Sequence, residues 1–207
     1  MLLPCTNHIY SYLSLRKSVG IIAILLPFVI LIITTISGEG IPRSISYSYY
    51  STARDVFVGS LCAIALLMFF YTGYSKIDNW AGNIVGLSSL GTVWLPPTPE
   101  GSEVDLVAGV HYISALLLFL TLSFFCLFLF TKSDVEKDLR TANKRIRNKI
   151  YIACGVIMLL CLAMEIYIFS NEKLGGEGTV LAYILQTVST VAFGFSWLVK
   201  GNFILKD

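Results

Sequence analysis

The chain has 207 residues, of which 56% are hydrophobic and 14% are charged, with a formal net charge of +2. Its mean hydropathy is +0.75, whereas soluble domains carry about 25% charged residues. This composition excludes an ordinary soluble protein and predicts an integral membrane protein without a nucleic-acid partner.

A helix that crosses a hydrocarbon core of about 30 Å needs about 20 predominantly apolar residues. Six such runs are bounded by charged residues, Pro or Gly, and they cover residues 19–37, 52–73, 80–95, 107–131, 150–170 and 179–199. They lack the period-two alternation of a transmembrane barrel. The first run follows Arg16 and Lys17 but ends without a signal-peptide cleavage site, so we expect it to be retained. The sequence therefore predicts a single all-α domain, residues 1–207, that forms a polytopic bundle of six transmembrane helices.

The distribution of basic residues predicts the orientation of this bundle. Six spans place both termini on one side of the membrane, and that side receives twelve of the fifteen Lys and Arg residues. The other side receives only Arg43, Arg54 and Lys173. Because cytoplasmic loops are enriched in Lys and Arg, both termini are expected to be cytoplasmic, with a bacterial inner membrane as the expected location.

A basic segment lies between the fourth and fifth runs. Residues 132–149, KSDVEKDLRTANKRIRNK, begin with the capping-box pattern Ser133-x-x-Glu136 and repeat basic residues at helical spacing. The pattern predicts a short cytoplasmic helix. It can bind anionic lipid headgroups, at about 1 kcal/mol per basic residue, or it can be a solvated topology signal.

Uncommon polar side chains collect on the side opposite the termini once the helix directions are assigned. Five of them lie at or near the corresponding ends of the runs: Arg54, Asp55, His111, Glu165 and Gln186. A charged side chain at mid-bilayer costs about 2.5–3.5 kcal/mol, so such residues face a bundle interior, a cavity or one another. The pattern predicts an outward-facing polar pocket, with Ser46, Tyr49 and Tyr50 as further ligand-binding side chains.

Two interpretations of Arg54 and Asp55 remain open. In the first, Thr52 caps the second helix, Asp55 completes a capping box, and Arg54 extends to the membrane interface. In the second, Asp55 pairs with His111, or Arg54 pairs with Glu165, across the pocket. His111 is equally well explained as a hydrogen-bond partner at a helix end or as a general base.

The third run, WAGNIVGLSSLGTVWLPP, carries a small-residue face. Gly82, Gly86 and Gly91 predict close helix packing, and Asn83 can form a hydrogen bond to another helix. Three tryptophans near run boundaries, Trp80, Trp94 and Trp197, are expected in interfacial aromatic belts. The five cysteines form no C-x-x-C motif and are expected to pack as small apolar residues, so we expect neither a metal site nor a cofactor.

Residues 44–130 resemble an uncharacterised bacterial family of six-helix integral membrane proteins, which is distantly similar to the eukaryotic DRAM and Sfk-type proteins. The resemblance rests on six positions, namely Ser46, Tyr50, Asp55, Asn83, Pro96 and His111. It implies a six-helix bundle and no particular activity. The chain is also similar to the CREST membrane hydrolases in combining Ser, Asp and His, but it has six runs instead of seven and one intramembrane His instead of three.

These observations favour a non-catalytic bundle that binds a lipid, a small amphiphile or a partner membrane protein, including a second copy of itself. The alternative is a membrane-embedded lipid-headgroup hydrolase, in which Asp55 orients His111 as the general base and Ser46 or a water acts as nucleophile. A small transporter is the second alternative, although the two halves of the chain show no repeat.

Overall fold

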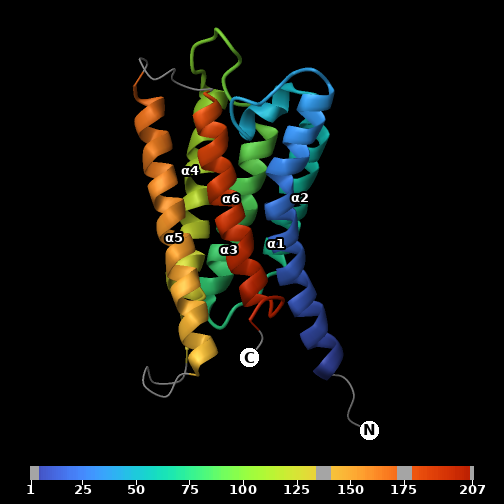
Figure 1. Ribbon diagram of the computed structural model, residues 1–207, viewed down its shortest axis with the longest axis vertical. Coiled ribbons are helices and arrows are strands. Elements are labelled where there is room, and N and C mark those ends of the chain that lie inside the picture. Colours follow the sequence, from blue (N-terminus) through green and yellow to red (C-terminus); the bar gives the residue numbers. More distant parts are fainter. Residues whose placement is uncertain (1–4, 134–140, 172–178, 206–207) are drawn as a thin grey trace.

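The computed structural model describes residues 5–133, 141–171 and 179–205, with side chains described from Tyr12 onward. All of its regular elements are helical within these ranges (Figure 1). In chain order they are α1 (Cys5–Ile36), the 3₁₀ helix η1 (Ser46–Tyr50), α2 (Arg54–Phe69), α3 (Lys76–Trp94), α4 (Leu106–Phe124), the π-helical turn η2 (Phe125–Leu129), α5 (Ala142–Phe169) and α6 (Val180–Lys200).

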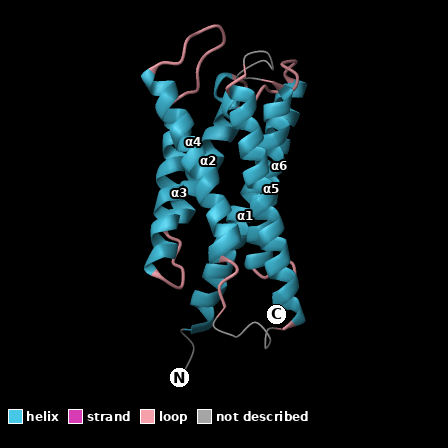
Figure 2. Cartoon of the chain, turned by 90° about the vertical axis from the view of Figure 1, so that its left-hand side faces the viewer, coloured by secondary structure: helices cyan, strands magenta, loops and turns pink. Residues whose placement is uncertain are grey.

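The six α-helices form a ring in chain order. Each α-helix packs against the next one along the chain, and α6 closes the ring against α1. The helices run roughly parallel to one common axis, with the connecting loops at the two ends of the bundle (Figure 2). The start of α1 and the end of α6 share the lower end of Figure 1, whereas η1 and the loop after α3 lie at the upper end. A ring of this kind encloses a central space.

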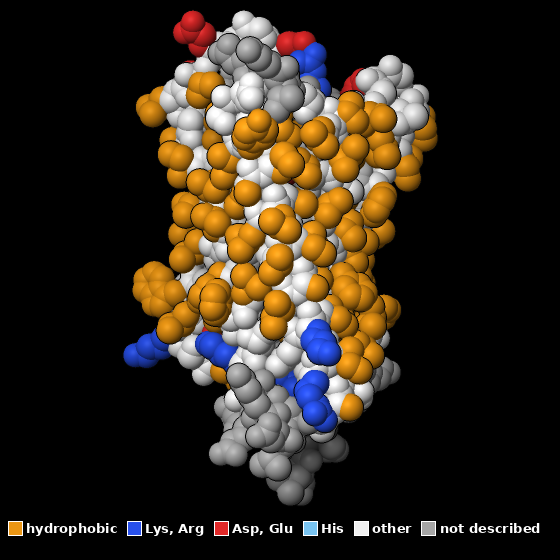
Figure 3. Space-filling view, turned by 60° about the vertical axis from the view of Figure 1, so that its left-hand side comes forward, with side chains coloured by type: hydrophobic (Ala, Val, Ile, Leu, Met, Phe, Trp, Pro, Cys, Tyr) orange, Lys and Arg blue, Asp and Glu red, His pale blue; other side chains and the backbone are white. Residues whose placement is uncertain are grey.

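Four helical segments are long and apolar enough to cross a membrane: Tyr12–Ile36, Leu106–Leu129, Ala142–Phe169 and Val180–Lys200. Four of the six predicted spans thus correspond to helices with the length and composition of a membrane span. Helix α2 has 16 residues and is about 24 Å long at 1.5 Å per residue, and α3 carries Lys76, Asp78 and Asn83. On the face drawn in Figure 3, hydrophobic side chains form a broad belt, with most of the Lys and Arg side chains at its lower end. These features fit an integral membrane protein.

Helices α1 and α5 begin eight residues or more before the apolar runs predict. Helix α1 begins at Cys5, ahead of the run that starts at residue 19. Helix α5 begins at Ala142, where the Thr141 hydroxyl accepts a hydrogen bond from the Lys144 N–H. Residues 142–149 are therefore the first two turns of α5 and do not form a separate short helix. The predicted capping box at Ser133 involves residues 134–140, which lie outside the described part of the chain.

The core of the lower half is aromatic. Trp197 is fully buried, with its ring centroid 5.3–5.8 Å from those of Tyr71, Phe125, Phe130 and Phe193. The prediction that Trp197 belongs to an interfacial belt is therefore wrong, because this residue lies on the face of α6 that points into the ring. Trp80 and Trp94, in contrast, are both largely exposed.

The glycines of α3 face its two neighbours. A Cβ atom at Gly82 would lie 2.9 Å from the Met68 carbonyl oxygen on α2, and one at Gly86 would overlap the Phe69 ring. Gly91 lies against Ser114 on α4. Asn83 is exposed on the outer face of α3 and has no hydrogen bond to another described residue. Its predicted role between helices is wrong because it lies one position past the buried Gly82, on a different face of the helix.

Candidate ligand cavity at the upper end of the ring

A cavity of about 340 Å³ lies inside the upper half of the ring. All six α-helices contribute to its wall, together with residues 44–47 before and within η1 and Pro97 after α3. Known ligand pockets measure about 300–1,000 Å³ and are mostly apolar with a few placed polar groups. The cavity has the size and composition of a small-molecule site.

Most of the side chains that line the cavity are aliphatic or aromatic, and the polar ones gather near its upper end. The polar lining residues are Ser44, Ser46, Tyr47, Ser89, Thr92, His111, Tyr112, Glu165, Gln186 and Thr190. The Ser89 hydroxyl is fully buried and has no hydrogen-bond partner among the described residues. The wall therefore combines an extensive apolar surface with hydrogen-bonding groups, one of which is unsatisfied.

Gln186 and Glu165 are held together at the cavity wall by the segment before η1. The backbone N–H of Ile45, a buried residue, donates to Gln186 Oε1 at 2.7 Å. Gln186 Nε2 in turn donates to Glu165 Oε2, although the distance of 3.5 Å is at the limit of a hydrogen bond. The main chain thus fixes the orientation of the amide, whose NH₂ group faces the Glu165 carboxylate.

His111 also lines the cavity, but its Nδ1 atom is used structurally. Nδ1 lies 2.7 Å from the carbonyl oxygen of Leu95, just past the end of α3. Since a carbonyl oxygen can only accept, this hydrogen bond requires the proton on Nδ1. Only 1% of His111 is exposed. The histidine therefore joins the start of α4 to the end of α3.

We expect replacement of His111 by phenylalanine to lower the free energy of unfolding by about 1 kcal/mol, because the Leu95 carbonyl loses its donor. Thermal unfolding in detergent micelles measures the effect. His111→Gln keeps a donor group and should recover part of the loss. A phenylalanine variant as stable as the wild type would contradict this structural role.

The predicted pairing of Asp55 with His111 is wrong. Asp55 is exposed in the first turn of α2, does not line the cavity, and has no hydrogen bond to His111 among the described residues. The capping interpretation also fails, because α2 begins at Arg54 with Ala53 as its N-cap and without a side-chain cap. The Thr52 N–H instead donates to the Glu39 carboxylate. A catalytic pair of Asp55 and His111 thus has no geometric support.

Arg54 and the two tyrosines of the prediction lie outside the cavity wall. Arg54 Nη2 donates to the Tyr49 hydroxyl at 2.8 Å, and its guanidinium lies over the Tyr49 ring. The predicted pair of Arg54 with Glu165 is therefore wrong. The Tyr50 hydroxyl donates to the Pro97 carbonyl oxygen at 2.7 Å, which ties η1 to the loop after α3. These residues cover the upper end of the ring and do not present free groups to a ligand.

Four predicted ligand-binding residues do meet around the cavity, namely Ser46, His111, Glu165 and Gln186. Two groups of the candidate site were not predicted from the sequence. The Ile45 N–H is a backbone group in an irregular segment, which no residue pattern could reveal. Ser89, within the Gly-rich α3, could have been found as a hydroxyl on the same helix face as Gly82 and Gly86, spaced by three to four residues.

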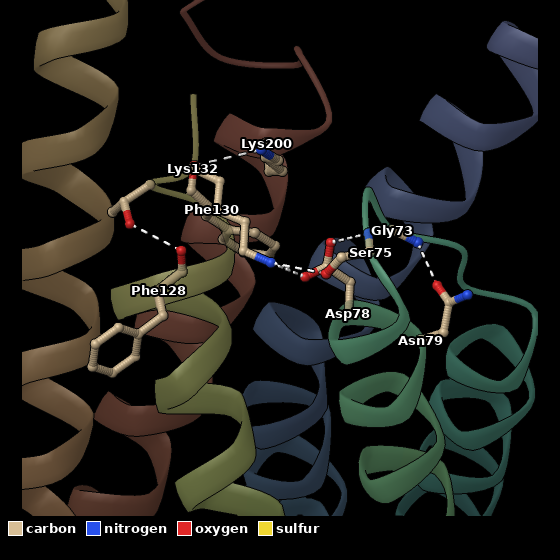
Figure 4. Close-up of polar contacts among 9 residues, drawn as sticks. Gly73, Ser75, Asp78, Asn79, Phe128, Phe130, Lys132 and Lys200 are labelled. Atoms are coloured by element: carbon tan, nitrogen blue, oxygen red, sulfur yellow. Dashed lines mark hydrogen bonds and ion pairs between the residues drawn. The ribbon is translucent and has the colours of Figure 1, made fainter. Parts of the chain in front are cut away.

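A second polar cluster lies at the lower end of the ring (Figure 4). Lys132 Nζ lies 2.5 Å from Asp78 Oδ1 and 3.1 Å from the Ser75 hydroxyl, and the Ser75 N–H donates to Asp78 Oδ2. Burial alone would raise the pKa of Asp78, but hydrogen bonds from Lys132 and from the Ser75 and Tyr74 N–H groups outweigh it, so the pKa lies below its usual value. Asp78 precedes the predicted third span.

Other cations of this cluster contact carbonyl groups at and after the end of η2 and at the end of α6. Lys200 Nζ approaches the Phe130 carbonyl oxygen at 3.5 Å, and Lys144 Nζ donates to the Phe130 and Lys132 carbonyl oxygens at 3.3 and 3.1 Å. Arg16 Nη1 lies 3.4 Å from the Lys200 carbonyl oxygen. Cations at helix C-termini are favoured by the macrodipole. These contacts stabilise the lower end of the ring, and this structural role accounts for the cluster.

Within the described ranges, no three His, Cys, Asp or Glu side chains converge as a metal site. Comparison with known proteins adds no candidate, because the chain matches no family model, no curated protein and no solved structure.

Proposed function

We propose that the protein is a six-helix membrane protein that binds a lipid or small amphiphile in the cavity of the ring. The cavity carries the proposal: about 340 Å³, lined by apolar side chains, with Glu165 and Gln186 at one place on its wall. An apolar chain would fill the interior, and the polar groups would contact a headgroup.

The membrane topology is part of this proposal. Helices α2 and α3 lie in the ring between α1 and α4, both of which are apolar enough to span. Six spans with both termini in the cytoplasm of a bacterial cell would place the basic lower end inside and the cavity in the outer half of the membrane. The resemblance to the bacterial six-helix family remains a prediction. It implies a bundle of six helices, with which this arrangement would agree.

Access from the lipid phase is supported by the wall of the cavity between α4 and α5. Ile113 on α4 is 59% exposed, Ile166 on α5 is 52% exposed, and both line the cavity. Side chains that contribute to both surfaces place the cavity next to the outer surface of the ring. A lateral route from the lipid phase would therefore pass these two side chains.

Filling the cavity tests the proposal. Ala115 on α4 lines it, and Ala115→Phe is expected to displace an apolar chain. Ala163 on α5 is exposed and does not line the cavity, so Ala163→Phe is the matched control. Native mass spectrometry of protein extracted with its membrane lipids should show a bound amphiphile in the wild type and the control, and a loss of about tenfold or more in occupancy in Ala115→Phe.

Both variants should first be shown to unfold at similar temperatures, so that a loss of ligand is not a loss of fold. If Ala115→Phe retains the same species at the wild-type level, or if the wild type retains none and binds none that is added, the cavity is not a ligand site.

A further inference from the structure

Glu165 has an unusual place in the cavity wall. Among the described residues that line the cavity it is the only carboxylate, and none of them is Lys or Arg. The side chain is partly buried, and the described residues make no ion pair with it. A carboxylate in apolar surroundings is unfavourable unless a cation or several hydrogen bonds compensate for the lost water.

The hydrogen bonds present do not supply this compensation. An ionised carboxylate can accept about four hydrogen bonds, whereas Gln186 Nε2, at 3.5 Å from Oε2, is the single side-chain donor to Glu165 among the described residues. This hydrogen bond is long, and its donor is uncharged. The remaining acceptor positions of Glu165 are therefore open to a group inside the cavity.

The Gln186 amide cannot rotate to present its oxygen atom to Glu165. Its Oε1 atom is held by the Ile45 N–H at 2.7 Å, so the amide presents N–H groups toward Glu165 and its oxygen away from it. If the amide rotated by half a turn, its NH₂ group would face the Ile45 N–H, donor against donor. The described residues thus present a carboxylate at the cavity wall and no positive group beside it.

We propose that the cavity selects amphiphiles that carry a primary ammonium group, with Glu165 as the counter-ion. An ammonium group supplies three N–H donors and a positive charge, which match the open acceptor positions and the uncompensated charge of the carboxylate. The unpaired Ser89 hydroxyl can accept or donate a further hydrogen bond deeper in the cavity. The inference rests on the proposed function, because it requires that the cavity be occupied by an amphiphile.

Three probes that carry alkyl chains of the same length separate the effect of charge from that of hydrophobicity. They are dodecylamine, dodecanol and dodecanoate. Their affinities for the purified full chain in nanodiscs are measured by isothermal titration calorimetry. The wild type should bind dodecylamine about tenfold or more tightly than dodecanol, since a hydrogen bond between two charged groups is stronger than one to a neutral hydroxyl. Dodecanoate should bind weakest.

Glu165→Gln keeps the shape of the side chain and one acceptor oxygen but removes its charge, and it should bind dodecylamine and dodecanol equally. The matched control is Glu103→Gln, which removes the same charge from an exposed position at the upper end that does not line the cavity. It should keep the wild-type preference. Loss of the preference in both variants would overturn the inference, because the effect would then come from net charge.

A second measurement distinguishes the sources of the ammonium group. Nanodiscs that contain phosphatidylethanolamine and phosphatidylglycerol in equal amounts are offered to the wild type and to Glu165→Gln, and retained lipids are identified by mass spectrometry. Retention of phosphatidylethanolamine that depends on Glu165 assigns a lipid headgroup, whereas preference for dodecylamine alone assigns a free long-chain amine. Preferential retention of phosphatidylglycerol would overturn the inference.

Failure of the inference can be told apart from failure of the proposed function. If the three probes bind the wild type with equal affinity and Ala115→Phe abolishes their binding, the cavity binds amphiphiles without selecting an ammonium group. If no probe binds and no lipid is retained, the proposed function fails as well.

Discussion

Gly194→Ala is expected to lower the free energy of unfolding by about 3 kcal/mol, because α1 and α6 cross with their backbones in contact at this position. A Cβ atom at Gly194 would lie 2.7 Å from the Gly20 carbonyl oxygen and 2.7 Å from Ile24 Cγ1. The contact is reciprocal, since a Cβ atom at Gly20 would lie 2.8 Å from the Gly194 carbonyl oxygen. A backbone atom cannot rotate away as a flexible side chain can, so the two helices must separate.

Gly59→Ala is the control for this prediction. Gly59 also lies inside a helix, α2, but a Cβ atom there would meet nothing within 4 Å. Alanine should therefore be neutral or stabilise the protein by about 0.5–1 kcal/mol through its higher helix propensity. Unfolding of both variants in detergent micelles compares them directly. Equal stability of the two variants would show that the crossing is looser than the structure describes.

Lys132→Met is expected to lower the free energy of unfolding by about 3 kcal/mol, because it leaves Asp78 buried without its cation. Asp78 is only 1% exposed, and Lys132 is the single ion-pair partner of Asp78 among the described residues. The pair joins the start of α3 to the segment after α4 (Figure 4). Lys76→Met, at an exposed position in the first turn of α3, is the control and should change stability little.

Two further measurements separate the ion pair from the packing of the lysine chain. The double variant Lys132→Met with Asp78→Asn should be more stable than Lys132→Met alone, since no charge then stays buried. The pKa of Asp78 is lowered in the folded protein, so this carboxylate contributes stability above its unfolded pKa of about 3.9, and the contribution is lost as pH falls through the folded pKa. Lys132→Met should lose this part of the acid dependence. An unchanged acid profile would contradict the pairing.

The composition and the spacing of apolar runs were enough to predict the class of protein and the approximate helices. Long apolar segments of Leu, Ile, Val and Phe have few structural alternatives in a bilayer, because every backbone polar group must be paired within the segment. The starts of α1 and α5 were not predictable in this way. Both helices continue into polar residues, where hydropathy no longer indicates a boundary although the backbone hydrogen bonding continues.

For the polar residues of the candidate site, the sequence predicted depth in the membrane but not which residues are in contact. Glu165 and Gln186 could be placed at the same depth, but their contact depends on α5 and α6 being neighbours in the ring. Asp55 and His111 were also placed at similar depth, yet Asp55 points away from the ring. Depth follows from position along a helix, whereas the facing direction also depends on how each helix is rotated within the bundle.

The sequence by itself thus determined that the chain is an apolar helical protein with charged groups near the helix ends. Each segment that lies in the hydrocarbon core must be apolar, and this requirement can be recognised in each segment separately. Only the tertiary structure decided that the six helices close into a ring, that Gly20 meets Gly194, and that the Ile45 backbone orients Gln186 toward Glu165. These contacts join residues far apart in the chain, and they depend on helix rotation and close packing, which no local pattern records.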